Sequence, residues 1–155
     1  MPVQKIRPFL WFGSNAEAAA NLYVSIFRDS KILNVMPSPE PGVAMGVEFQ
    51  IEGQQYIAFN GGPHYALTEA VSLMVLCETQ TEVDMYWDKL TADGGQSSRC
   101  GWLKDKFGLS WQIIPEALPR LMSDSDRVRA QRVVQAMLTM NKIEIAGLQK
   151  AYDGE

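Results

Sequence analysis

Residues 6–27, with the sequence IRPFLWFGSNAEAAANLYVSIF, predict a short strand followed directly by an amphipathic helix. The segment 6–12 is aromatic and rich in strand-forming residues, and Gly13-Ser14-Asn15 ends it. Ser14 stands three residues before Glu17, which is the spacing of a helix capping box. The apolar residues that follow recur at helical spacing and form one stripe: Ala19, Leu22, Tyr23, Ile26 and Phe27.

Three further strands are expected after this helix. They cover residues 31–36, 43–51 and 55–60, and a loop rich in proline and glycine separates the first two. Glu52-Gly53-Gln54 predicts a tight hairpin turn between the last two. The first part of the chain therefore follows the order strand, helix, three strands.

The same order begins again at residue 70, in the sequence AVSLMVLCETQTEVDMYWDKL. Thr79 stands three residues before Glu82, which predicts a second capping box. A shift of about 64 positions superimposes the two helical stripes, so that Ala19 corresponds to Val83 and Tyr23 to Trp87. Strands are then expected over residues 97–100, 102–104 and 109–114.

These patterns predict an α+β fold built from two βαβββ modules, with helices at the C-terminus. The expected boundaries are 1–64 for the first module, 65–116 for the second and 117–155 for the helical tail. Within the tail, Asp126 and its neighbours provide N-cap chemistry for a helix that reaches about Lys142. Its methionines fit either simple core filling or a flexible ligand surface.

An apolar face continues along the tail to the end of the chain, through Ile145, Leu148 and Tyr152. Such a segment is not stable alone, so it must dock on its own sheet or on a second copy of the chain. This apolar tail is one of two reasons to expect a homodimer, and the other is the family resemblance described below.

Composition narrows the classes of partner. The formal net charge is −4 and no basic stripe is visible, which argues against a nucleic-acid partner. No apolar run approaches the ~18 residues that a membrane-spanning helix needs, and residues 1–8 lack an apolar run of signal-peptide length. Cys77 and Cys100 fit two buried thiols in strands better than a disulfide, which favours a reducing, cytoplasmic location.

Four segments together resemble one known group of proteins. They are Pro8–Phe12, Leu22–Phe27, the run Phe59-Asn60-Gly61-Gly62-Pro63-His64, and residues 105–112 with the sequence DKFGLSWQ. Over nearly its whole length the chain resembles the PhnB-like branch of the vicinal oxygen chelate (VOC) superfamily, often labelled 3-demethylubiquinone-9 3-methyltransferase. The superfamily includes glyoxalase I, bleomycin-resistance proteins and extradiol dioxygenases. The resemblance implies a curved mixed sheet around a small-molecule pocket, and dimers.

The resemblance also implies four strand positions at which superfamily enzymes hold a divalent metal. In this chain they fall on Pro8, Ser72, Ala58 (or Asn60, two residues along) and Gln112. Only Gln112 is a plausible ligand, whereas a catalytic metal needs about three good protein ligands. We therefore expect neither a metal nor another cofactor.

The remaining site residues follow from residue chemistry. His64 is the only histidine and fits either a proton-transfer group or a structural loop residue. The amides of Asn60 and Gln112 suit a polar ligand group, or cross-strand hydrogen bonds. Four aromatic residues fit either the wall of a cavity or the core: Phe9, Trp11, Trp102 and Trp111.

Two further acidic residues complete the set of candidates. Asp105 is expected to cap the turn at Phe107-Gly108 through its side chain. Glu48 could face a pocket as a base, or face water.

Together these features favour a metal-independent protein that binds a small, partly apolar molecule, with or without weak enzymatic activity. The alternatives are a metal-dependent enzyme of the glyoxalase or dioxygenase type, and a methyltransferase, as the family label states. The sequence contains no glycine-rich strand-to-helix turn of the kind that a Rossmann-like cofactor site requires.

Overall fold

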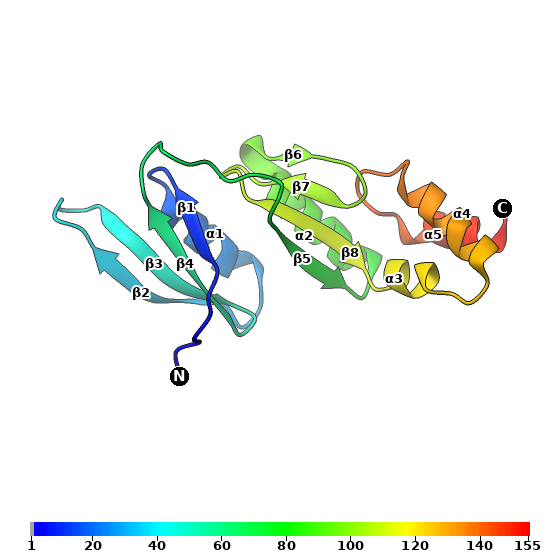
Figure 1. The fold of residues 1–155 in the computed structure, drawn as a ribbon, viewed down its shortest axis with the longest axis horizontal. Helices are drawn as coiled ribbons and strands as arrows, with labels where there is room; N and C mark the ends of the chain where they lie inside the picture. The colour runs from blue at the N-terminus through cyan, green and yellow to red at the C-terminus, as the bar shows by residue number, and fades with distance from the viewer. Residues whose placement is uncertain (1) are drawn as a thin grey trace. The chain divides into compact units, whose positions relative to one another are not determined.

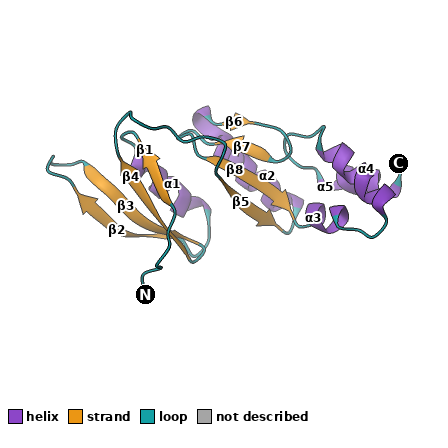
Figure 2. Ribbon diagram, in the orientation of Figure 1, coloured by secondary structure: helices purple, strands orange, loops and turns teal. Residues whose placement is uncertain are grey.

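The computed structural model describes residues 2–155, which form two compact units. One unit ends at Leu67 and the other runs from Thr68 to Glu155. Each contains a four-stranded mixed sheet and a helix in the order strand, helix, three strands, and the second unit adds three C-terminal helices (Figures 1 and 2). The predicted α+β fold with two βαβββ modules and C-terminal helices is confirmed.

The elements of the first unit are β1 (Phe9–Phe12), α1 (Ala16–Ile26), β2 (Lys31–Pro37), β3 (Ala44–Ile51) and β4 (Gln54–Asn60). The sheet order is β1-β4-β3-β2, in which β1 and β4 are parallel and the other pairs are antiparallel. The predicted hairpin turn joins β3 to β4. It consists of Glu52 and Gly53, both at positive φ. A two-residue turn with positive φ at both positions matches the right-handed twist of the strands that it joins.

One face of this sheet packs under α1. Tyr23 of the helix is fully buried, together with Val47, Phe49 and Ala58 of the sheet. The helix starts differently from the prediction, because Asn15 occupies the N-cap position and makes no side-chain cap bond. Instead, the side-chain oxygen of Asn60 accepts a hydrogen bond from Ala16 N at 2.8 Å. The predicted capping box at Ser14 is therefore wrong, because a residue distant in sequence supplies the cap.

The second unit contains β5 (Ser72–Cys77), α2 (Gln80–Thr91), the 3-10 turn η1 (Ala92–Gly94), β6 (Gln96–Ser97), β7 (Trp102–Lys104) and β8 (Ser110–Pro115). Its sheet order is β5-β8-β7-β6, again with the first pair parallel. The predicted strand over 97–100 is wrong beyond Ser97. Cys100 lies in a turn at φ 60° rather than in a strand, and the chain reverses there before β7.

The predicted cap of α2 is confirmed. Thr79 Oγ1 accepts from Glu82 N at 3.2 Å, and the Glu82 carboxylate accepts from Glu78 N at 2.7 Å. One of the amide groups that the N-terminus of α2 leaves unpaired, Glu82 N, is thus satisfied locally, as is the amide of Glu78 just before the N-cap.

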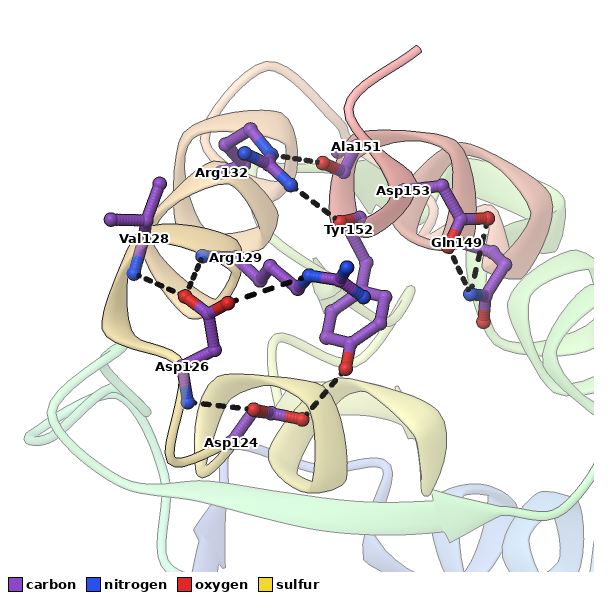
Figure 3. Close-up of polar contacts among 9 residues, drawn as sticks. All are labelled: Asp124, Asp126, Val128, Arg129, Arg132, Gln149, Ala151, Tyr152 and Asp153. Atoms are coloured by element: carbon purple, nitrogen blue, oxygen red, sulfur yellow. Dashed lines mark hydrogen bonds and ion pairs between the residues drawn. The ribbon is translucent and has the colours of Figure 1, made fainter.

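The C-terminal helices are α3 (Ala117–Met122), α4 (Arg127–Met137) and α5 (Ile145–Asp153). The predicted helix to Lys142 is therefore wrong at its end, because α4 stops at Met137 and the chain turns into α5. Asp126 caps α4 as predicted, through bonds from Val128 N and Arg129 N. Figure 3 shows two hydrogen bonds that link α4 and the residues before it to α5. Tyr152 donates to the Asp124 carboxylate, and Arg132 donates to the carbonyl of Ala151.

The tail docks on its own sheet. Its buried side chains form one cluster with Ile114 of β8: Leu118, Leu121, Val133, Ile143 and Leu148. The amide of Cys100 donates to Met140 O, and the Gln80 side chain bonds both Ile143 O and Ile145 N. No helix among residues 2–155 is long and apolar enough to cross a membrane.

Thr79→Ala is expected to lower the free energy of unfolding by about 1 kcal/mol, because it removes the side-chain acceptor at the start of α2. The matched control is Ser14→Ala, at the predicted cap that the structure does not use. Chemical denaturation of both variants checks this. Equal losses in the two would contradict the assignment of the caps.

Candidate functional site

Each helix covers one face of its sheet, and the register of the strands identifies the residues on the opposite, open face. In the first unit Phe9 pairs with Ile57 and Trp11 with Phe59, all pointing away from α1 because their neighbours Leu10 and Phe12 face the helix. Phe9 is 55% exposed. The open face of the first sheet is therefore aromatic.

Trp11 is the best-anchored residue of this face. Its indole nitrogen donates to Gly62 O at 3.0 Å, and its ring lies edge-on to Phe59 and Tyr65. A Cβ atom at Gly61 would lie 2.2 Å from the Trp11 ring, so only glycine fits there. In the sequence motif at residues 59–64, Gly61 thus leaves space for the Trp11 ring, and Gly62 provides the carbonyl that the indole nitrogen bonds.

The polar residues of the first unit are mostly engaged. Asn60 donates to Ala44 O while its oxygen accepts from Ala16 N, so its amide holds the end of β4 against α1. Glu48, on the open face, pairs with Arg7 at 3.4 Å. His64 is exposed in the loop after Gly62 and has no side-chain hydrogen bond or ion pair within residues 2–155, so its proton-transfer role stays a prediction.

The second sheet has a more polar open face. Met74 pairs with Gln112 and Gln112 with Trp102, and the pair Ser110–Lys104 lies one step along the same face. Gln112 Nε2 donates to Ser72 Oγ at 2.9 Å. Gln112 and Ser72, two of the positions that the resemblance implies for a metal, thus bond each other.

A groove of about 400 Å³ lies where this open face meets the C-terminal helices. The sheet contributes Met74, Trp102, Gln112 and Ile114, and the turn before β7 contributes Cys100. The helical side consists of Leu118, Pro119, Met122, Ser123 and Met137. Of the predicted site residues, Trp102 and Gln112 are brought together here.

Trp111 has a different position. It is 1% exposed, and its neighbour in the ladder is Leu103, on the face that α2 covers. Its indole donates to the Asp105 carboxylate at 2.9 Å, while Phe107 N and Leu109 N also donate to that carboxylate. Asp105 therefore caps the turn as predicted, and Trp111 is a core residue.

The helical side of the groove was not among the predicted site residues. Met122 and Met137 are spaced as core residues of short helices, and nothing in that spacing distinguishes a packed side from a groove wall. Two signals in the sequence bear on this side of the groove: the apolar face of the tail, which predicts docking without its target, and the methionines, for which a flexible ligand surface is one of two predicted roles.

The donor groups present do not fit a metal centre of the superfamily type. No three His, Cys, Asp or Glu side chains within residues 2–155 lie close enough to hold an ion together. At the positions the family would use, the Gln112 amide nitrogen is bonded to Ser72, and the Asn60 amide is bonded to backbone on both sides. Neutral amides and a hydroxyl are also weak ligands for a catalytic divalent ion.

The two thiols differ in accessibility. Cys77 is fully buried in β5, and burial, with a smaller effect of the Glu82 carboxylate, raises the pKa of Cys77 to about 12. Cys100 is partly exposed and lines the groove. Because the thiolate is the reactive form, the two should react very differently.

We expect iodoacetamide at pH 8 to modify Cys100 and leave Cys77 unmodified in the folded protein. Mass spectrometry of tryptic peptides measures the two sites separately, and the same reaction in urea supplies the fully modified reference. Rapid modification of Cys77 in the native state would contradict its burial.

Gly61→Ala is expected to lower the free energy of unfolding by about 1–3 kcal/mol, because the new methyl group overlaps the Trp11 ring. Gly13→Ala is the control, since a Cβ atom there meets nothing within 4 Å. Thermal denaturation compares them. A Gly61→Ala variant as stable as the control would show that Trp11 is not held in this position.

Residues 4–114 match the family described as 3-demethylubiquinone-9 3-methyltransferase. The match ends within β8, so the three C-terminal helices lie beyond it, and the expected resemblance over nearly the whole chain is too long. No curated protein matches the chain.

Two solved structures illustrate the likeness. A PhnB protein from Bacillus cereus is 32% identical, with a TM-score of 0.66, and the alignment covers 72% of this chain and 99% of that one. Protein PA1353 from Pseudomonas aeruginosa is 19% identical, with a TM-score of 0.61 over 74% of this chain and 98% of that one, and it supports the fold alone. From the family match and the Bacillus cereus likeness, we conclude that the chain belongs to the 3-demethylubiquinone-9 3-methyltransferase family, in its PhnB-like group.

Proposed function

We propose that this protein binds a small, mainly apolar molecule, without a metal, in the groove between the open face of the second sheet and the C-terminal helices. The observation that carries the proposal is the groove itself, with a volume of about 400 Å³ and a wall of methionine, tryptophan and aliphatic side chains around one amide. Small-molecule sites commonly have this composition.

The apolar wall supplies the affinity. Met74 is 60% exposed and Trp102 is partly buried, so a ligand that covers them removes apolar surface from water. Met122 and Met137 face the same space from the helices, and their unbranched, polarizable side chains adapt to ligands of different shape.

Gln112 supplies the polar contact. Its Nε2 is bonded to Ser72 Oγ, which orients the amide, and its Oε1 has no partner among residues 2–155. That oxygen can accept a hydrogen bond from a ligand hydroxyl or N–H group. A ligand with one such donor and an apolar body therefore fits this groove best.

A methyltransferase activity has support only in the descriptions of the family and of the Bacillus cereus protein. The connection from β1 to α1 is Gly13-Ser14-Asn15, and it is not the glycine-rich phosphate-binding turn of a Rossmann-like cofactor site. Calorimetric titration with S-adenosylmethionine decides the matter, and saturable binding would favour the methyltransferase over the function proposed above.

We expect N-phenyl-1-naphthylamine, a neutral apolar fluorescent probe with one N–H donor, to bind saturably at one site per chain. Prior modification of Cys100 with N-ethylmaleimide should abolish binding, because the adduct occupies the groove. The Cys100→Ser variant, treated identically, is the control and should still bind. Unchanged binding to the modified wild-type protein would place the site elsewhere.

The same probe tests the absence of a metal requirement. Its dissociation constant should be unchanged, within twofold, after exhaustive dialysis against EDTA. Loss of binding with the chelator, recovered on addition of one equivalent of a divalent ion, would favour the metal-dependent alternative.

A further inference from the structure

A second, smaller pocket of about 240 Å³ continues the open face of the second sheet beyond Trp102. Trp102 lines both the groove and this pocket. The adjacency follows from the ladder, in which Trp102 pairs with Gln112 and, two residues along each strand, Lys104 pairs with Ser110. In contrast to the groove, the pocket is polar: it is lined by Glu69, Gln96, Ser97, Ser98, Trp102, Leu103, Lys104 and Ser110.

Ser110 is the unusual residue of this pocket. The residue is 1% exposed, and its buried Oγ has no hydrogen-bond partner within residues 2–155. A buried hydroxyl without a partner costs about 1–3 kcal/mol, so such groups are rare unless something else satisfies them. Ser110 points to the open face, because its neighbour Trp111 faces α2.

Lys104 lies beside Ser110 on the same face and brings the positive charge. In this structure its ammonium group bonds the carboxylate of Glu69, which is 67% exposed. The bond to Lys104 is also the main cause that lowers the pKa of the Glu69 carboxyl. An exposed ion pair contributes little to stability, so a ligand can replace its acidic member at small cost. The Glu69 carboxylate thus indicates that the ammonium group of Lys104 can bind an anionic oxygen group at this position.

We propose that this pocket is an oxyanion subsite, and that the molecule bound in the groove carries a carboxylate or phosphonate group that binds Lys104 and Ser110. The inference rests on the function proposed above and specifies its ligand as an amphipathic anion. Lys104 supplies the charge and Ser110 a buried hydroxyl donor, and Ser97 and Ser98 supply further hydroxyls at the rim. Charge-assisted hydrogen bonds of this kind are stronger than neutral ones.

The test is displacement of N-phenyl-1-naphthylamine by compounds that share one apolar chain. Octanoate, octylphosphonate and the neutral 1-octanol are compared. We expect the better of the two anions to displace the probe at roughly one-tenth of the concentration that 1-octanol requires, because one charge-assisted contact is worth about that factor. The comparison of the two anions distinguishes a carboxylate ligand from a phosphonate ligand.

Variants then assign the effect to the pocket. Lys104→Gln should bring the anions to the level of 1-octanol, whereas Lys106→Gln makes the same change in net charge outside the pocket and should leave the preference intact. Glu69→Gln should strengthen displacement by the anions, since it removes the competing carboxylate. Ser110→Ala should weaken the anions without lowering the melting temperature, because the lost hydroxyl had no partner to leave unpaired.

Three results would overturn the proposal: equal displacement by anions and 1-octanol, an anion preference that survives Lys104→Gln, or a destabilised Ser110→Ala variant. Each of these leaves probe binding intact and so leaves the proposed groove in place. Failure of the probe itself to bind would instead remove the proposed function.

Discussion

A single helix covers only one face of a four-stranded sheet, and this limit determines the chemistry of both units. In each unit the helix covers the sheet face on which buried apolar side chains recur at every second strand position, such as Val47 and Phe49 under α1. The opposite face carries large side chains, among them Phe9 and Met74, that the helix of its own unit does not reach. Apolar surface left in this way is where proteins commonly bind partners or ligands.

The open faces of the two units differ in their polar groups and in what covers them. In the first unit the open face is aromatic and its polar groups are paired, since Arg7 engages Glu48 and Trp11 donates to the backbone. In the second unit the C-terminal helices cover the end of the face at Ile114 and leave a groove further along it. The groove is therefore a consequence of incomplete coverage by a segment that lies beyond the family match.

This arrangement separates the motifs at residues 59–64 and 105–112 from the proposed ligand contacts. The glycine motif after β4 leaves space for the Trp11 ring. The Asp105 carboxylate accepts from Phe107 N and Leu109 N of its own turn and from the indole nitrogen of the buried Trp111. Both motifs stabilise the modules on which the family fold depends. The groove wall, in contrast, comes partly from Met122 and Met137 of the tail, so proteins that share the modules but lack this tail would present a different site.

The sequence by itself determined the modular order, the second helix cap and the turn at Asp105, because each depends on residues within a few positions of one another. Thr79 and Glu82 are one helical turn apart, and no distant contact is needed to make them a cap. The tertiary structure decided the rest. It gave the cap of α1 to Asn60, buried Trp111, placed Trp102 and Gln112 on a common groove, and left the Ser110 hydroxyl unpaired beside Lys104. These outcomes depend on which strands are neighbours and where the tail docks, and strand pairing and docking join residues that local sequence patterns cannot connect.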